Sequence, residues 1–135
     1  MLRKTLVVSA LAGFALAGVA LAQNPPVTPS PVKRTIVAKI EVPDSNYEVI
    51  TAMLEIAPGF KAGRHFHPGL VTGHILEGTF WYALDGEPEK TFGPGEAVAI
   101  PMKGIHNEGA VGDKPMKAVV TYVVEKGQPL VQPVK

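Results

Sequence analysis

The stretch GFKAGRHFH at positions 59 to 67 places two histidines one residue apart. Successive side chains of a β-strand point to opposite faces, so His65 and His67 project from the same face of a predicted strand. Two imidazoles in this arrangement can bind a single metal ion. The spacing alone leaves two interpretations open, a metal site and a pair of ordinary core or surface histidines.

A third histidine, His106, comes shortly after a second glycine-containing stretch, GEAVAIP at positions 95 to 101. We predict that it lies at the end of a later strand, which must run beside the strand of His65 and His67 for the three imidazoles to meet. The candidate metal ligands are therefore His65, His67 and His106. The sequence singles out no catalytic residue.

Outward from these stretches, the chain reads as short strands separated by turns. Gly and Pro, 14 and 13 in number among 135 residues, are spread along it, which favours a turn-rich β architecture over a helical bundle. Asp85 followed by Gly86 is typical of a tight hairpin turn. Strands are expected at 34–42, 47–57, 64–67, 70–77, 79–84, 90–92, 96–100 and 117–124. This spacing predicts an all-β sandwich or barrel.

The overall composition excludes several classes of function. A length of 135 residues is enough for one domain, and a hydrophobic share of 46% is enough to bury a core. The net charge of +1, with no run of more than two basic residues, argues against nucleic acid or an anionic membrane as the main partner. The absence of cysteine rules out disulfides, thiolate metal sites and a cysteine nucleophile.

The first 22 residues have the layout of a bacterial-type secretory (Sec) signal peptide. Arg3 and Lys4 precede an apolar run, 6–22, that ends in the small-residue pattern Ala-Leu-Ala. The alternative is a retained membrane anchor, but the run is at the short limit for spanning a bilayer. We therefore expect cleavage after residue 22, a periplasmic or secreted protein, and no membrane contact after cleavage. The remaining chain divides into a proline-rich linker at 23–32, a barrel domain at 33–126 and a C-terminal tail at 127–135.

The two histidine-containing stretches resemble the two sequence motifs of the cupin family. The first, 59–67 with Gly78 after it, is similar to the motif that carries two histidines, and the second, 95–101 with His106 after it, is similar to the motif that carries one. The resemblance extends over residues 47 to 125. It implies a small single-domain cupin with a double-stranded β-helix, or jelly-roll, barrel. In that family, the three histidines and a glutamate bind a divalent metal inside the barrel.

The sequence departs from the family at the acidic ligand. The cupin glutamate falls at Val71, four residues after His67, and Thr72 beside it is a poor ligand. One expected outcome is a metal held by three neutral imidazoles, which keeps its full double charge and favours anionic or chelating substrates. The other is a metal-free or weakly binding pocket whose apolar lining Val71 extends.

Strand alternation and turn position decide where the other candidate residues are expected. If Val71 points inward, His74 points to the other side, as a surface or interface histidine, unless a bulge at Gly73 reverses the strand. Three polar residues are expected to be solvated turn residues, the alternative being that they hold an imidazole N–H: Glu77, Asn107 and Glu108. The residues that either line a pocket or form ordinary core are Phe60, Phe80, Tyr82, Ile100 and Tyr122.

Trp81 lies on the face of its strand opposite Phe80 and Tyr82, and therefore outside the predicted barrel. It marks either a dimer interface or a place where the N-terminal arm packs. Small cupins are often dimers, so the resemblance implies a homodimer.

Together, the residues and the resemblance predict an exported cupin that binds a divalent metal through His65, His67 and His106 and acts on a small organic substrate. The resemblance favours dioxygenase-type oxidation and, among iron, manganese, zinc, nickel and copper, it favours iron. Two alternatives remain. The first is a non-catalytic periplasmic module that binds an apolar or carbohydrate ligand, which Val71 in place of glutamate favours. The second is hydrolysis at zinc, since three histidines and a water form a workable zinc site.

Overall fold

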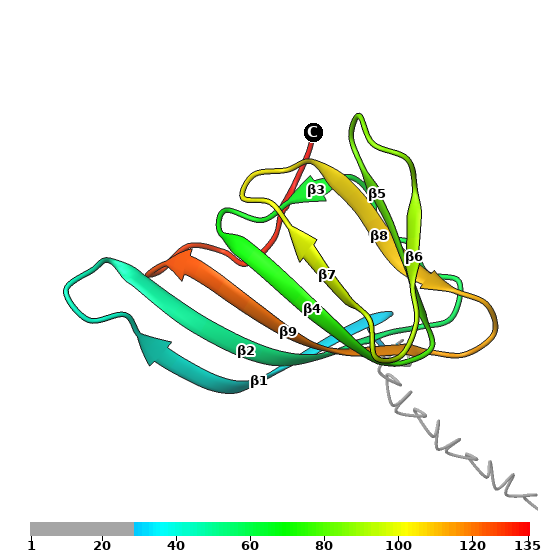
Figure 1. Ribbon diagram of the computed structural model, residues 1–135, viewed down its shortest axis with the longest axis horizontal. Helices are drawn as coiled ribbons and strands as arrows, with labels where there is room; N and C mark the ends of the chain where they lie inside the picture. The colour runs from blue at the N-terminus through cyan, green and yellow to red at the C-terminus, as the bar shows by residue number, and fades with distance from the viewer. Residues whose placement is uncertain (1–28) are drawn as a thin grey trace, which may run out of the picture.

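The computed structural model describes residues 29–135, so the predicted signal peptide and most of the predicted linker lie outside the described residues. Within 29–135 the chain forms ten strands and no helix (Figure 1). This part of the chain accordingly holds no helix with the length and apolar character to cross a membrane. The strands are β1 (Val32–Glu41), β2 (Tyr47–Ile56), β3 (His65–Phe66), β4 (Leu70–Glu77), β5 (Thr79–Leu84), β6 (Lys90–Phe92), β7 (Ala97–Ile100), β8 (His106–Val111), β9 (Met116–Glu125) and β10 (Gln132–Pro133).

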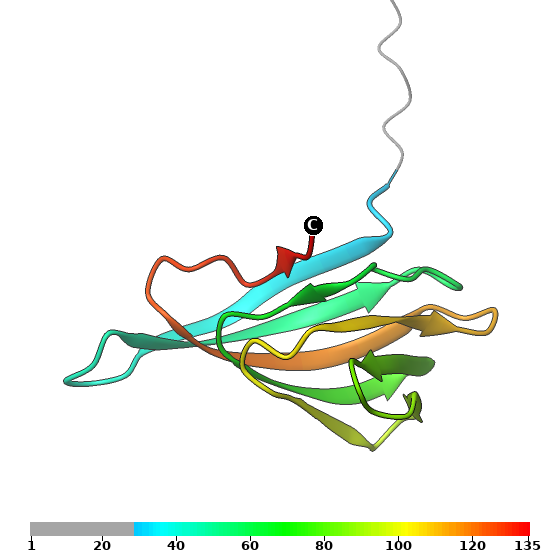
Figure 2. The same cartoon turned by 90° about the horizontal axis from the view of Figure 1, so that it is seen from above.

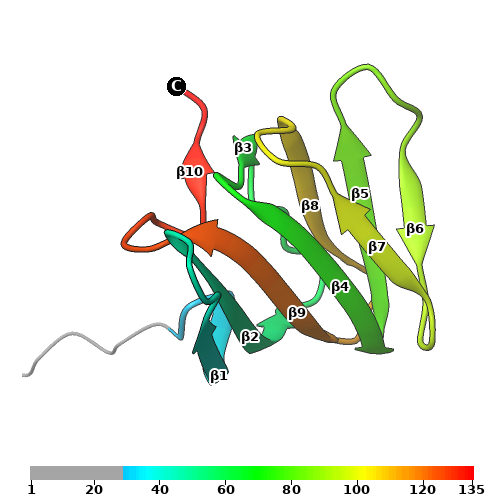
Figure 3. The same ribbon diagram turned by 60° about the vertical axis from the view of Figure 1, so that its left-hand side comes forward.

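The strands form two antiparallel sheets of five strands each. The first sheet has the order β1-β2-β9-β4-β7 and the second has the order β10-β3-β8-β5-β6. The two sheets form the layers seen from above in Figure 2. The edge strands β7 and β6 lie on one side of the barrel, and β1 and β10 lie on the other (Figure 3). This arrangement confirms the predicted all-β barrel.

The core lies between the sheets and follows from strand alternation. In β2 and β9 every second side chain is buried, and the two strands pair without interruption from Tyr47 opposite Glu125 to Ile56 opposite Met116. Complete burial of a large aliphatic side chain stabilises the fold by about 1.5–3 kcal/mol. The apolar core therefore supplies a rigid platform for the few polar residues buried beside it.

Each predicted strand has a counterpart whose ends lie within two residues of those expected, but two strands were missed. His106 begins β8, so the prediction that it lies at the end of a strand is wrong. The inward side chains at the start of β8 are His106 and Glu108, and the apolar alternation that marks a strand is therefore missing there. The second missed strand, β10, pairs with β3, and Leu130 packs against the core. Residues 127–135, expected as a tail, thus lie on the barrel.

Segment 60–62 pairs antiparallel with β8, with Lys61 opposite Gly109. The Ala110 N–H donates to the Phe60 carbonyl at 3.0 Å, and the Ala62 N–H donates to the Glu108 carbonyl at 2.8 Å. A Cβ atom on Gly109 would overlap the Phe60 carbonyl oxygen. Glycine is therefore required here by the close approach of two backbones, and this pairing holds the strand that carries Glu108.

Trp81 lies on the opposite strand face from Phe80 and Tyr82, as predicted, but only 9% of it is exposed. Its Nε1 donates to the Glu89 carboxylate at 3.0 Å, and the Lys61 ammonium lies 3.9 Å from the ring centre. The cover that the sequence assigned to a partner chain or to the N-terminal arm is thus provided by Lys61 and Glu89.

Candidate metal centre

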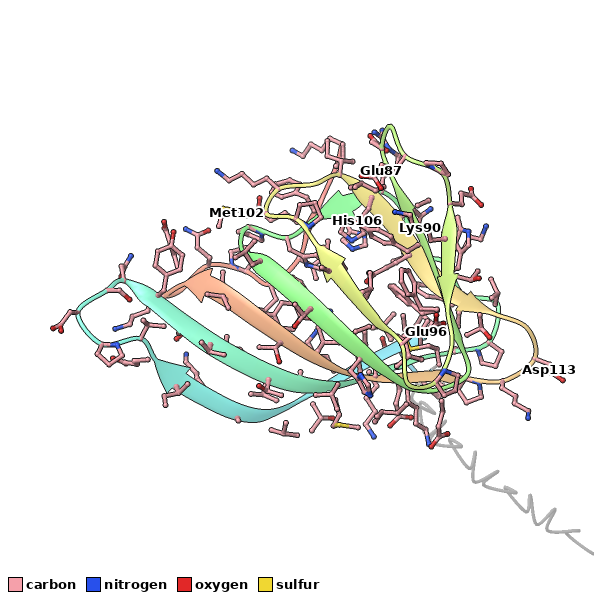
Figure 4. All side chains as sticks on the ribbon, viewed as in Figure 1. Glu87, Lys90, Glu96, Met102, His106 and Asp113 are labelled. Carbon is pink, nitrogen blue, oxygen red and sulfur yellow. The ribbon has the colours of Figure 1, made fainter. Side chains whose placement is uncertain are left out.

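The three predicted histidines lie together inside the barrel. His65 in β3 is directly opposite His106 in β8, and His67 follows β3 immediately. The ring centres are 4.3 Å apart for His65 and His106, 5.0 Å for His67 and His106, and 5.2 Å for His65 and His67. Each residue is at most 3% exposed. Figure 4 shows His106 in the space between β7 and the second sheet.

Main-chain carbonyl groups orient all three imidazoles. The Nδ1 atoms of the histidines lie 2.7 to 2.8 Å from carbonyl oxygens, in the pairs His65 with Gly63, His67 with Leu130 and His106 with Gly104. Because a carbonyl oxygen only accepts hydrogen bonds, each Nδ1 carries the proton and each Nε2 keeps a free lone pair. Hydrogen bonds of this kind fix the orientation of metal-binding histidines and raise their basicity.

The three Nε2 atoms point toward a common space and have no hydrogen-bond partner among the described residues. A buried polar atom without a partner costs about 1–3 kcal/mol, so three such atoms together need an explanation. A metal ion in this space would accept all three lone pairs. The donor set therefore fits a divalent metal.

Glu108 provides the fourth potential ligand. Its two carboxylate oxygens lie 3.6 Å from His65 Nε2 and 3.5 Å from His106 Nε2, and the residue is 8% exposed. One ligand atom from each histidine and from Glu108 fits within a separation of 4.8 Å. The four residues can hold one metal ion.

The prediction that the acidic ligand is missing is therefore wrong, and Glu108 is not a solvated turn residue. Val71 is buried in the barrel as expected, but the carboxylate comes from β8 instead of β4. His106 and Glu108 repeat in β8 the alternate spacing that His65 and His67 have at β3. That repeated spacing is the signal in the sequence that could have identified Glu108.

The ionisation states of these groups favour a cation. Burial alone raises the pKa of Glu108, but the adjacent imidazoles of His106 and His65 outweigh burial and hold the pKa of this carboxyl well below its usual range. Burial lowers the pKa of His65, but the Glu108 carboxylate and the Gly63 carbonyl outweigh it and raise the pKa. Burial lowers the pKa of His67 to about 4. At neutral pH the centre therefore offers an ionised carboxylate and a neutral His67.

Affinity for a divalent metal is expected to fall as the pH is lowered. Binding displaces the proton from His65, whose pKa is raised above the ordinary value of about 6.5, so the decline begins above that pH. Below the pKa, the affinity falls about tenfold per pH unit for each proton displaced. Titration with Co(II) at a series of pH values from about 8 to about 5 measures this dependence. An affinity that stays constant over the series contradicts ligation by His65.

Residues 126–135, which we call the C-terminal strap, help to hold the first two histidines. The strap supplies the Leu130 carbonyl to His67, pairs with β3 through β10, and donates the Val134 N–H to the Arg64 carbonyl at 3.1 Å. The Lys103 N–H, from the loop after β7, donates to the His67 carbonyl at 2.8 Å. His67 is thus fixed from two sides.

Deletion of residues 127–135 is expected to weaken Co(II) binding about 10- to 100-fold, because His67 loses the carbonyl that orients it. Calorimetric titration measures the affinity. The matched control is Leu130→Ala, which keeps the main-chain carbonyl and removes only a partly buried side chain. If the control loses as much affinity as the deletion, the strap acts through packing and not through its carbonyl group.

A small cavity adjoins the centre. Its free volume is about 20 Å³, and its polar walls are His67, Glu108 and Tyr122. The other walls are apolar or glycine: Leu54, Val71, Gly73, Ile75, Phe80, Val98, Ile100, Met116, Ala118 and Val120. The Tyr122 hydroxyl accepts a hydrogen bond from Arg34 Nε at 3.0 Å, and the Tyr122 ring lies 5.9 Å from the His67 ring. The cavity has room for one molecule the size of water.

The remaining candidates lie outside the centre. His74 is exposed, and its neighbours Gly73 and Ile75 are buried, so the predicted strand alternation is confirmed. Glu77 is exposed and pairs with Lys117 at 3.2 Å. Asn107 holds no imidazole, but its Oδ1 accepts the Gly63 N–H at 3.0 Å and so supports the turn before His65.

Comparison with known protein families gives one match. Residues 52–122 match a family profile described as "Cupin domain", and this segment contains all four residues of the centre. No curated protein matches the chain.

The fold is similar to several solved structures. DMSP lyase DddQ from Ruegeria pomeroyi has a TM-score of 0.57 and 22% identity, over 67% of this chain and 44% of that one. A cupin-like protein from Thermotoga maritima has a TM-score of 0.60 and 21% identity, over 76% and 75%. The polyketide cyclase RemF from Streptomyces resistomycificus has a TM-score of 0.61 and 24% identity, over 78% and 72%. The match thus spans less than half of the DddQ chain. Identities this low establish the fold alone, the predicted double-stranded β-helix barrel.

Proposed function

Because the chain belongs to the cupin family, we propose that it is a metal-dependent enzyme that oxidises a small organic molecule with dioxygen, by dioxygenase-type chemistry. The observation that carries the proposal is the set of three buried, unpartnered Nε2 atoms around the Glu108 carboxylate. His65, His67, His106 and Glu108 would hold the ion, for which we propose iron. A divalent ion bound there supplies Lewis-acid chemistry and, if it is iron, redox chemistry.

The residues around the ion site set its charge and its access to water. Three neutral imidazoles and one carboxylate leave a divalent ion with a single positive charge, so Glu108 moderates the attraction of anions. The neighbouring cavity is nearly apolar, and its three polar walls are His67, Glu108 and Tyr122.

This cavity supports oxidation over hydrolysis. A buried water needs about two to four polar partners, and only three of the thirteen residues that line the cavity are polar. A small apolar molecule such as dioxygen loses nothing in such a place, and the free volume of about 20 Å³ suits it. The organic substrate is too large for the cavity and must bind elsewhere on the centre.

The test is reconstitution of the purified protein with Fe(II) without air, followed by elemental analysis and by measurement of dioxygen uptake with small phenols, diketones and carboxylic acids. We expect one iron per chain in the wild type, none in His106→Ala, and dioxygen uptake only with the iron-loaded wild type. Failure to take up iron rejects the proposed iron centre, and failure to take up zinc as well rejects the metal centre. Uptake of zinc with hydrolysis, and no reaction with dioxygen, supports a zinc hydrolase instead.

The alternative of a non-catalytic binding module is weakened by Glu108. Its main support was the absence of an acidic ligand at Val71, and the carboxylate on β8 replaces that ligand. A protein that binds a small molecule equally well with and without His67→Ala, and that shows no metal-dependent turnover, would restore this alternative.

We also propose that the protein is exported and forms a homodimer. Export is supported by the leader pattern of residues 1–22. Dimerisation is supported by β1, a long edge strand on which Ile36, Val37 and Ile40 are 49%, 55% and 67% exposed. N-terminal sequencing of the mature protein tests export. The molar mass from light scattering, measured as the protein leaves a size-exclusion column, tests dimerisation.

A further inference from the structure

Tyr82 is buried beside the metal centre, and its hydroxyl forms no hydrogen bond with the described residues. It lies in β5, 4% exposed, and its ring centre is 5.3 Å from that of His106. The hydroxyl has neither a hydrogen-bond partner among the described residues nor appreciable accessible surface. Neither the residues at 29–135 nor bulk water satisfies it.

In the described part of the chain, four buried side-chain polar atoms lack a partner, and three of them are the Nε2 atoms of the metal centre. The fourth is the Tyr82 hydroxyl. The other inward tyrosine beside the centre, Tyr122, is different because its hydroxyl accepts a hydrogen bond from Arg34 at 3.0 Å. Unpaired buried hydroxyls are unfavourable, so the exception at Tyr82 points to a partner that comes from outside the chain.

Tyr82 also forms part of a groove between the free edges of the two sheets, at β6 and β7. The groove has a volume of about 380 Å³, and its lining combines polar residues with apolar ones, among them Leu84, Phe92 and Val98. Glu87 and Lys90 lie in its outer part, about half exposed and paired at 2.9 Å. Figure 4 shows both of them on the β5–β6 side of the space that contains His106.

We infer that the substrate enters through this groove and that the Tyr82 hydroxyl donates a hydrogen bond to one of its oxygen atoms, a carbonyl, enolate or phenolate oxygen, beside His106. The substrate class is a small molecule with an apolar part that carries such an oxygen. The inference rests on the proposed function, because it assigns the place where the organic substrate of that reaction binds. Tyr82 acts here as a positioning residue.

The chemistry of the groove agrees with this role. Burial, together with the carboxylates of Glu87 and Glu108, raises the pKa of Tyr82 to about 12, so the hydroxyl remains a donor at neutral pH. The ion pair of Glu87 and Lys90 leaves the outer part without net charge and so does not select for a charged molecule. Lys90 lies opposite Tyr82 in the strand pairing, and both Lys90 and Glu87 are long and about half exposed, so neither need block the groove.

The experiment compares Tyr82→Phe with the wild type, using 4-nitrocatechol as the probe and quenching of the single tryptophan, Trp81, as the readout. Binding is measured with metal-free and with Co(II)-loaded protein, and stability is measured from the urea midpoint without metal. We expect Tyr82→Phe to bind the probe about tenfold more weakly, with unchanged Co(II) affinity and an unchanged or higher urea midpoint. Tyr122→Phe is the matched contrast, and it should lower the midpoint because it removes a paired hydroxyl.

Two results overturn the inference. If Tyr82→Phe lowers the urea midpoint and leaves probe affinity unchanged, the hydroxyl serves the fold through an internal water. If the wild type binds the probe in neither form, the groove does not admit an oxygen-bearing ligand of this class. Failure of the wild type to bind Co(II) rejects the proposed metal centre instead, and the metal-free arm still decides the role of Tyr82.

Discussion

Replacing Glu108 by glutamine is expected to lower the affinity for Fe(II) and Co(II) by more than about a hundredfold, since the loss of a direct ligand exceeds the 10- to 100-fold effect of losing a supporting residue. The amide has the shape of the carboxylate but not its charge, and its nitrogen cannot bind a cation. Its NH₂ group can instead donate to one of the two Nε2 atoms, which lie 3.5 and 3.6 Å from different Glu108 oxygens. Glu108→Gln should therefore fold well and bind metal poorly.

Calorimetric titration with Co(II) measures this loss, and thermal unfolding of the metal-free protein confirms that the variant is folded. Glu77→Gln is the matched control, since it changes an exposed glutamate that pairs only with Lys117. A second variant, Val71→Glu combined with Glu108→Gln, places the acid where the family carries it and should regain part of the affinity. If Glu108→Gln binds Co(II) as tightly as the wild type, Glu108 is not a ligand.

Replacing Gly109 by alanine is expected to lower the free energy of unfolding by about 2–4 kcal/mol, a large effect for the addition of one methyl group. The new Cβ would overlap the Phe60 carbonyl oxygen and lie 3.1 Å from the Lys61 Cα, and both of these are backbone atoms that cannot turn aside. Separation of segment 60–62 from β8 would also release the hydrogen bond between Ala62 and Glu108. Metal affinity should fall together with stability.

Urea unfolding measures the change, and Gly93→Ala is the control. A Cβ on Gly93 would meet only the Glu96 carboxylate at 3.7 Å. The φ angle of Gly93 is negative, so alanine can adopt it. The two variants add the same methyl group, so a difference in their free energies of unfolding measures the effect of the close backbone pairing at Gly109. Equal stabilities for the two variants would refute the close approach.

The sequence predicted the parts of the molecule that follow a repeating pattern. Alternation in β2, β4 and β9 identifies the core, and the spacing of His65 and His67 places both imidazoles on one face. The same alternation correctly turns His74 outward. These predictions succeed because burial and strand geometry act on each residue locally.

Glu108 was not predicted because β8 lacks the apolar alternation that marks a strand. Its inward positions at the start carry His106 and Glu108, whose role is to bind an ion and not to form core, so the apolar signal is lost at the functional strand. The strap was missed for another reason. It contributes the main-chain carbonyl of Leu130 to His67, and a main-chain contact leaves no recognisable residue pattern in the sequence. Only the three-dimensional path of the chain shows that contact.

Main-chain oxygens, and not side chains, hold the imidazoles, at Gly63, Gly104 and Leu130. Every amino acid possesses such an oxygen, so mutation cannot delete these supports as long as the backbone keeps its course. The cavity and the groove are lined by side chains, which single substitutions can change one at a time. Descendants of this protein could therefore acquire new substrates while inheriting the same ion-binding geometry.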